Sequence, residues 1–314
     1  MRKIIDFHTH LGDIFNGNQN MAFKKRKHMD FGVYPDPFKD LEESGFNRPL
    51  IVPDEEAQNT LILAGQYRMW EEGGLEATQQ SLDENGVTFT VSLPCFPNTC
   101  FEEALAASML EPRIIPFTSP DFSLTIPEMR RKLESDIAHG AKGMKVHPQI
   151  QNINPNDPRV GAAIEVLGGA GLPTLFHFGV NTYYVTGDPN NDITPAEYGA
   201  LHYCFDILAR YPQYPIVVGH AGGNCGGELE ELGAELAKHD WPNVYVDTSF
   251  KNAETMRRMV ELLGEDHVLF GTDYPFTKIK YSIAECEKAF ADQPDVLNKV
   301  FYANAVRLMH LFED

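Results

Sequence analysis

The chain has 314 residues, of which 43% are hydrophobic and 23% are charged, and its formal net charge is −19. This balance is ordinary for a globular protein, but it argues against binding to nucleic acid or to anionic membranes, since both attract positively charged surfaces. Five cysteines without a CxxC pair predict reduced thiols and a cytoplasmic location. The sequence shows neither a signal-peptide pattern nor an apolar run long enough to span a membrane.

Short apolar runs recur along the chain and predict eight buried parallel strands. Each run is mostly apolar on both faces, as are strands that helices cover on both sides. The runs span residues 3–10, 87–94, 113–120, 142–148, 173–179, 215–222, 243–250 and 267–274.

Segments with helical spacing alternate with these runs, and several of them end in glycine or proline, which commonly terminate helices. They span residues 75–85, 102–111, 125–140, 157–171, 195–212, 227–239, 253–264 and 282–292, and a further C-terminal helix is predicted at 297–312. Eight strands alternating with eight helices predict an α/β fold, the (β/α)8 or TIM barrel, with residues 1–314 forming one domain.

The first connection is much longer than the others. Residues 11–70 are rich in Gly, Pro, Asn and charged residues. A loop of this length is uncommon in a compact domain unless it has a function. We therefore predict a cap insertion over the mouth of the barrel. Its basic run KKRKH at 24–28 is interpreted as a solvated surface, with steering of an anionic substrate as the alternative.

Polar side chains stand at the ends of the predicted strands, where barrel enzymes hold their catalytic groups. His8 and His10 are two residues apart in the first run, so they point to the same face of a strand. Asp273 ends the eighth run, which adjoins the first in a closed barrel, and His177 stands in the fifth. Three imidazoles with one carboxylate suit Zn²⁺, iron or Mn²⁺.

Four runs, taken in this order, resemble the amidohydrolase superfamily and its amidohydrolase-related branch: IIDFHTH, PTLFHFG, VVGHAGG and VLFGTDYPF. The branch contains metal-dependent barrel hydrolases and decarboxylases. The resemblance implies one divalent metal ion, zinc by expectation with manganese or iron as alternatives, held by His8, His10, His177 and Asp273. It also implies that His220 in the sixth run polarises substrate or water without binding the metal, and that Asp273 carries a proton during catalysis.

The fourth run, KGMKVHP, places Lys145 and His147 on one strand face. Both are expected to contact the substrate. In two-metal members of the superfamily a carbamylated lysine stands on this strand, but we interpret Lys145 as an unmodified interior lysine and expect no second metal. Asp6 is a candidate for orienting an imidazole ligand, with the end of a buried hydrogen-bond network as the alternative. Asp247 and Ser249 in the seventh run are further interior polar residues without an assigned role.

Metal ions lower the pKa of bound water towards about 7, which permits hydrolysis. The run KGMKVHP resembles the KGxKxHP run of uncharacterised hydrolases of the branch, so we expect hydrolysis of an amide, lactone or ester carbonyl. The expected substrate is a small, carboxylated molecule. The alternative is a decarboxylase of the aminocarboxymuconate-semialdehyde decarboxylase type, since the same ligands serve both reactions. A barrel with only a structural metal fits less well, because such sites are closed by four protein ligands. The resemblance also suggests a homodimer.

Overall fold

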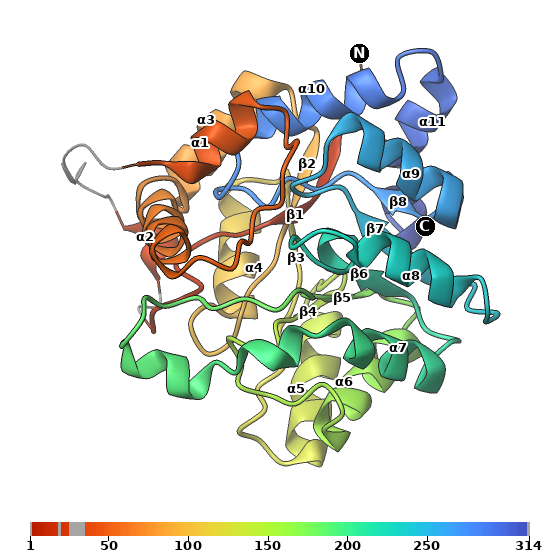
Figure 1. Ribbon diagram of the computed structural model, residues 1–314. Coiled ribbons are helices and arrows are strands. Elements are labelled where there is room, and N and C mark those ends of the chain that lie inside the picture. Colours follow the sequence, from red (N-terminus) through yellow and green to blue (C-terminus); the bar gives the residue numbers. More distant parts are fainter. Residues whose placement is uncertain (1, 18–19, 25–34, 313–314) are drawn as a thin grey trace.

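The computed structural model describes residues 2–17, 20–24 and 35–312, in which eight parallel strands are surrounded by helices (Figure 1). The strands are β1 (Ile5–Thr9), β2 (Phe89–Ser92), β3 (Ile114–Pro116), β4 (Met144–Val146), β5 (Thr174–Phe176), β6 (Ile216–Val218), β7 (Val244–Asp247) and β8 (Val268–Leu269). The helices are α1 (Pro37–Glu43), α2 (Glu55–Glu72), α3 (Leu75–Asn85), α4 (Phe101–Leu110), α5 (Ile126–Ala138), α6 (Pro158–Gly169), α7 (Leu201–Arg210), α8 (Glu228–Leu236), α9 (Ala253–Leu263), α10 (Ile279–Ala289), α11 (Pro294–Asn298) and α12 (Asn304–Leu308).

Two sheets join to close the barrel. The strand orders are β1-β2-β3 and β4-β5-β6-β7-β8, and single parallel bridges connect them at Thr9–Tyr274 and Thr118–Met144. The backbone N–H of His10 donates to the Tyr274 carbonyl at 2.7 Å, which fixes the segment after β8 against the end of β1. The predicted (β/α)8 barrel is therefore confirmed, with its eighth strand beside its first.

Every predicted strand overlaps an observed one, but the observed strands are shorter. His147, His177, His220 and Asp273 all follow the last residue of their strands. His220 and Asp273 have φ angles of 55° and 62°, a left-handed conformation that cannot continue a strand ladder. The chain therefore turns away where the polar residues begin.

Local signals explain most helix ends. The Asn252 side chain accepts a hydrogen bond from the Thr255 N–H and so caps the start of α9. The prediction of one helix over 195–212 is wrong, because Ala200 has an extended backbone that separates a short turn at Ala196–Gly199 from α7. The predicted C-terminal helix begins earlier than expected, at Pro294, and passes through a π-helical turn at Lys299–Ala303 into α12.

The barrel has an inner and an outer apolar layer. Inside, Phe7, Leu175 and Val217 belong to one buried cluster that also includes Leu308 of α12. Outside, strand residues such as Val218 pack in a second cluster with the surrounding helices. Each strand is therefore buried on both faces, which explains its continuous apolar sequence.

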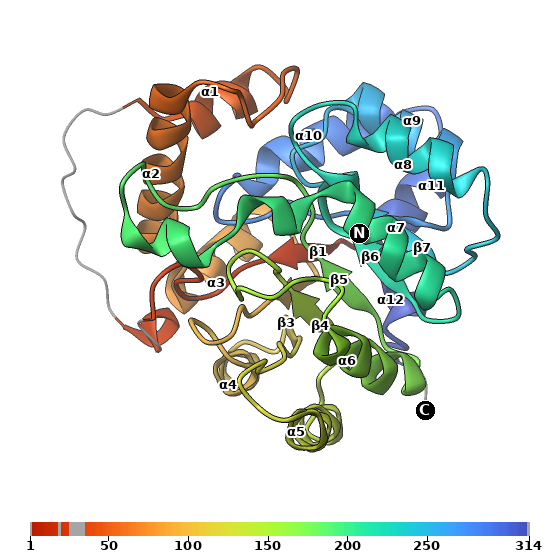
Figure 2. The ribbon, with the colours of Figure 1, turned by 60° about the horizontal axis from the view of Figure 1, so that its bottom comes forward.

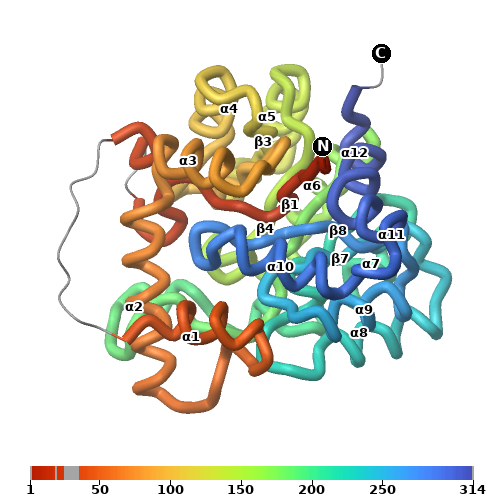
Figure 3. Tube along the Cα trace, turned by 90° about the horizontal axis from the view of Figure 1, so that it is seen from above, coloured from red at the N-terminus to blue at the C-terminus, as the bar shows by residue number. Residues whose placement is uncertain are grey.

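The segment between β1 and α3 contains α1 and α2, which the sequence analysis did not predict. Asp54 caps α2 by accepting from the Ala57 N–H at 2.8 Å. Gln66 of α2 donates to the Tyr183 carbonyl in the long loop after β5, and Figure 2 shows that loop beside α2. α1 and α2 lie together on one side of the molecule, away from α12 (Figure 3). Of the basic run at 24–28, residues 25–28 lie outside the described residues.

A buried ion cluster attaches these two helices to the barrel. Arg68 of α2 donates to Glu42 of α1 at 2.6 Å and to the Phe276 carbonyl after β8 at 2.8 Å. It also pairs with Asp36 at 2.8 Å. Since the Phe276 segment follows directly on Asp273, this cluster connects the helices to one edge of the candidate site. Among the helices described, none is both long and apolar enough to cross a membrane.

Candidate metal centre and active site

A bulge in β1 decides which of its side chains face the barrel interior. Asp6 pairs with Thr90, and Thr9 pairs with Ser92. Between these two pairs β1 advances by three residues while β2 advances by two, so β1 contains one extra residue. A bulge of this kind interrupts the regular alternation of side chains along a strand. Phe7 lies in the inner apolar cluster, and the imidazole of the next residue, His8, also lies among the polar groups of the barrel interior.

Asp6 therefore does not orient an imidazole. Its carboxylate accepts from the Thr272 hydroxyl at 2.6 Å and from the backbone N–H groups of Thr272 and His8 at 3.0 and 3.3 Å. Burial raises the pKa of Asp6 to about 7, although these hydrogen bonds oppose the rise. Asp6 thus connects the backbones of β1 and the segment after β8.

Three of the predicted ligands converge on one point. The Asp273 Oδ1 atom lies 3.1 Å from His10 Nε2 and 3.5 Å from His8 Nε2. The Nδ1 atom of His10 donates to the Leu93 carbonyl at 2.9 Å, and that of His8 donates to an Asp247 carboxylate oxygen at 3.0 Å. An uncharged imidazole that donates from Nδ1 presents a lone pair at Nε2. Two lone pairs and a carboxylate oxygen therefore face one another.

This arrangement fits a divalent metal ion. Asp273 Oδ1 is buried and has no hydrogen-bond partner within the described part of the chain. The three potential ligand atoms lie within 4.8 Å of one another. Three acceptors at such distances repel one another unless a cation lies between them, and two imidazoles with a carboxylate are a common ligand set for Zn²⁺ and related metals.

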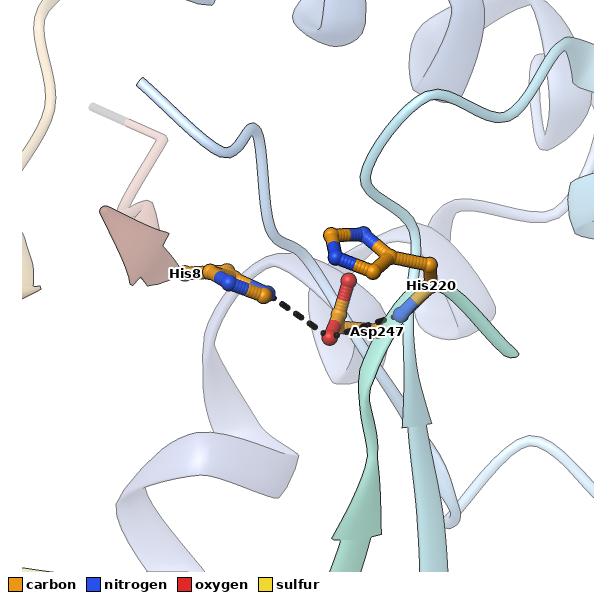
Figure 4. Close-up of side chains that lie close together, drawn as sticks. All are labelled: His8, His220 and Asp247. Atoms are coloured by element: carbon orange, nitrogen blue, oxygen red, sulfur yellow. Dashed lines mark hydrogen bonds and ion pairs between the residues drawn. The ribbon is translucent and has the colours of Figure 1, made fainter. Parts of the chain in front are cut away.

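A second group of possible ligands consists of His8, His220 and Asp247 (Figure 4). Asp247 lies between the two histidines and accepts from the His8 ring and, at 3.3 Å, from the His220 backbone N–H. It also accepts from the Ser249 N–H at 3.1 Å and from the Ser249 hydroxyl. Because its oxygens already receive these protons, we interpret Asp247 as the residue that orients His8, not as a ligand.

His177 belongs to neither group of three. Its Nδ1 lies 3.0 Å from Nε2 of His220, and its Nε2 lies 2.7 Å from the Tyr183 hydroxyl. The other ring nitrogen of His220 lies 2.6 Å from the Ser249 hydroxyl. The role of His177 as a fourth ligand therefore stays a prediction. Tyr183 was missed, because its position depends on the path of the loop after β5, for which the sequence has no signal.

The two residues predicted from the fourth run occupy different environments. Lys145 is fully buried, and its Nζ lies 3.2 Å from His8 Nε2. His147 stacks on His177 with ring centroids 4.1 Å apart and lines a pocket. Contact with a substrate is therefore open to His147, whereas Lys145 is not among the lining residues described.

A sequence profile of the family described as Amidohydrolase matches residues 5–311 of this chain. The chain belongs to the amidohydrolase family. No curated protein sequence matches it.

Solved structures show the same fold as this amidohydrolase. A manganese-containing dihydroxybenzoic acid decarboxylase from Polaromonas is similar with a TM-score of 0.66 and 16% identity, over 100% of this chain and 98% of that chain. A 5-carboxyvanillate decarboxylase from Sphingomonas paucimobilis has a TM-score of 0.63 and 15% identity, over 99% of both chains. A probable 2-pyrone-4,6-dicarboxylic acid hydrolase from Acinetobacter baumannii has a TM-score of 0.58 and 15% identity, over 98% of this chain and 99% of that chain. Identities this low support the TIM-barrel fold and do not identify the reaction.

Burial sets the charge states in this amidohydrolase site. It lowers the pKa values of His8, His147, His177 and His220 well below the usual histidine range, and neighbouring Lys145 or other histidines lower most of them further. Uncharged imidazole is the form that binds metals. Burial alone would raise the pKa of Asp273, but His8, His10 and Lys145 outweigh it and hold that pKa below its usual value. Burial also lowers the pKa of Lys145.

The candidate metal-ligand group of the amidohydrolase lies beside an open pocket with about 710 Å³ of empty space, including its open mouth. Its floor includes His10, His147, His177, His220 and Asp273, all placed by the ends of barrel strands. Its walls come from the segment between β1 and α3 and from the loops after β5 to β8. A concave, mainly apolar site with a few convergent polar groups is typical of small-molecule binding.

The close packing behind His8 requires glycine at position 271. A Cβ atom there would lie 2.9 Å from the His8 Cβ and 3.2 Å from the Asp247 Cβ. Because glycine has no side chain, the segment after β8 can approach β1 and β7 closely. His8 and Asp247 can then form their hydrogen bond.

Proposed function

We propose that this amidohydrolase is a metal-dependent hydrolase that cleaves an amide, lactone or ester carbonyl in a small molecule. The observation that carries the proposal is Asp273 Oδ1, buried without a hydrogen-bond partner in the described chain and facing the lone pairs of His8 and His10. A group with this arrangement beside an open pocket suits a catalytic metal, which needs a free coordination position.

His8, His10 and Asp273 would hold the ion, with His177 proposed as the fourth ligand. When bound, a divalent ion lowers the pKa of water and polarises a carbonyl oxygen. Zinc is our first expectation, and manganese or iron are the alternatives. A second metal on a carbamylated Lys145 is not part of the proposal.

Asp273 and His220 are the residues that transfer the proton in this proposal. Asp273 Oδ2 accepts the proton of the attacking water, and His220 Nε2, 3.9 Å from that oxygen, passes it to the leaving group. The hydrogen bonds of His220 suit this task. Its Nδ1 donates to the Ser249 hydroxyl, which donates in turn to Asp247, so the charge of a protonated His220 is stabilised from behind.

Decarboxylation is the second candidate. Two of the similar structures described above are decarboxylases, and one of them contains manganese. In that reaction the metal centre would hold the substrate beside its carboxylate, and Asp273 or His220 would deliver a proton to carbon.

The cytoplasmic location and the homodimer also remain predictions.

The test begins with elemental analysis of the purified protein, followed by loading with Zn²⁺ or Mn²⁺. The loaded enzyme is assayed with aryl esters, lactones and anilides, and in parallel with aromatic carboxylates while CO2 release is measured. Metal-dependent hydrolysis that disappears in Asp273→Asn supports the proposal. CO2 release without hydrolysis would assign the protein to the decarboxylases, and full activity in Asp273→Asn would refute the assigned site.

A further inference from the structure

We infer that the substrate is an uncharged molecule with an apolar, ring-sized body, that is, a neutral ester, lactone or amide. The nature of the reacting bond rests on the proposed function. The apolar body rests on the pocket alone, and the absence of charge rests on the pocket and on the net charge of the chain.

Four phenylalanines form a continuous wall of the pocket. Phe276 contacts Phe15 and Phe38 with ring centroids 5.7 and 6.1 Å apart, and Phe38 contacts Phe250 at 6.2 Å. Phe15 and Phe38 come from the segment after β1, whereas Phe250 and Phe276 follow β7 and β8. All four line the pocket, together with aliphatic residues of which Leu61 is one. A wall of this kind gains free energy by removing apolar surface of a ligand from water.

The described lining contains no lysine or arginine. Two of the cations near this lining are bound to protein groups. Arg68 pairs with Glu42 and Asp36, and Lys251 donates to the Gly223 carbonyl at 2.6 Å and to the Asn224 side chain at 2.9 Å. Lys145 is fully buried against His8.

A substrate carboxylate away from the metal would therefore lose its hydration without gaining a cationic partner among the lining residues that the structure describes, which is unfavourable. The formal net charge of −19 adds a repulsive long-range field for anions. The sequence-based expectation of a carboxylated substrate thus finds no supporting charge in the described lining. A neutral substrate meets neither penalty.

One neutral polar contact is available in the same lining, from Gln58. The Gln58 side chain donates through Nε2 to Asn181 at 2.7 Å, which leaves Oε1 as an acceptor. That oxygen is buried and lacks a hydrogen-bond partner among the residues described, and Gln58 lines the pocket. An N–H or O–H group of a neutral substrate would satisfy it.

The test compares two ligands of similar size on the metal-loaded protein: 4-methylbenzamide and 4-carbamoylbenzoate. They differ by a methyl group against a carboxylate, and binding is measured by calorimetry. We expect the neutral amide to bind at least about tenfold more tightly. Equal or tighter binding of the carboxylate overturns the inference, and so does failure of both ligands to bind at millimolar concentration.

Variants connect this preference to the pocket. Phe276→Leu should weaken binding of 4-methylbenzamide several-fold, whereas Phe290→Leu, a buried core substitution outside the described lining, should leave it unchanged. Ile51→Lys adds a cation to a partly exposed position of the lining and should reduce the preference for the neutral ligand. Equal effects of the two phenylalanine substitutions, or an unchanged preference in Ile51→Lys, would contradict the inference.

Kinetics separate this inference from the proposed function. Phenyl acetate and its 4-carboxy derivative present the same ester with and without charge. Faster hydrolysis of the carboxylated ester would overturn the substrate class and leave the hydrolase proposal standing. CO2 release from aromatic acids without ester hydrolysis would overturn the hydrolase proposal, while the binding comparison still decides the substrate charge.

Discussion

Replacing Arg68 with methionine should release the helices α1 and α2 from the barrel. The guanidinium makes two hydrogen bonds to the Glu42 carboxylate, at 2.6 and 3.2 Å, and one to the Phe276 carbonyl at 2.8 Å. The Arg68→Met side chain keeps much of the buried hydrocarbon but supplies no charge. Glu42, which is only 3% exposed, would then be a buried carboxylate whose remaining donor is the Lys278 backbone N–H at 2.7 Å.

Removal of one partner from a buried ion pair costs about 3–5 kcal/mol, because the other charge is left without compensation. Asp36 contributes less, since its side chain is 27% exposed and water can replace the arginine. We therefore expect Arg68→Met to lower the free energy of unfolding by about 3–5 kcal/mol. The double variant Arg68→Met/Glu42→Gln should recover a large part of this loss, because the stranded charge is gone.

Urea unfolding measures the free energies, and hydrogen exchange of α1 and α2 shows whether the loss is local to these helices. Arg130→Met is the matched control. Arg130 pairs with Glu165, and the two side chains are 37% and 44% exposed, so the loss of this pair should cost at most about 1 kcal/mol. The reasoning is refuted if Arg68→Met costs no more than Arg130→Met, or if the double variant is as unstable as the single one.

Three further predictions concern the candidate site. His10→Ala should bind well below one equivalent of metal, whereas His220→Ala should keep its metal and lose turnover. Elemental analysis measures the metal content, and an activity assay measures turnover. Metal loss in His220→Ala would make His220 a ligand. Asp247→Asn should weaken metal affinity about 10–100-fold by releasing His8, as measured by competition with a chromogenic chelator, and an unchanged affinity would exclude the orienting role. Gly271→Ala should destabilise the protein by about 1–3 kcal/mol in thermal unfolding, since its Cβ would lie 2.9 Å from that of His8; full stability would show that the strands have room to separate.

The barrel and part of its site could be predicted because their signals are local or follow from closure. Apolar runs and helical spacing can be recognised within a few neighbouring residues. Eight alternating strand–helix units are compatible with few folds other than the barrel. Closure then places Asp273 beside His8 and His10, and the structure finds these three together. The exact ends of the strands could not be predicted from the sequence, since the left-handed turns at His220 and Asp273 depend on the residues packed around them in the folded chain.

The sequence by itself thus determined the order of the eight strands, the alternation of strands with helices from α3 onwards, the family, and the polar residues at the strand ends. Only the tertiary structure decided that a bulge in β1 turns His8 towards Asp247, that His177 pairs with His220 and Tyr183, and that phenylalanines from distant segments make one wall. The physical reason is the range of the interactions. Strand and helix patterns repeat within a few residues, whereas a tautomer, a loop path or a pocket wall depends on groups that only the folded chain brings together.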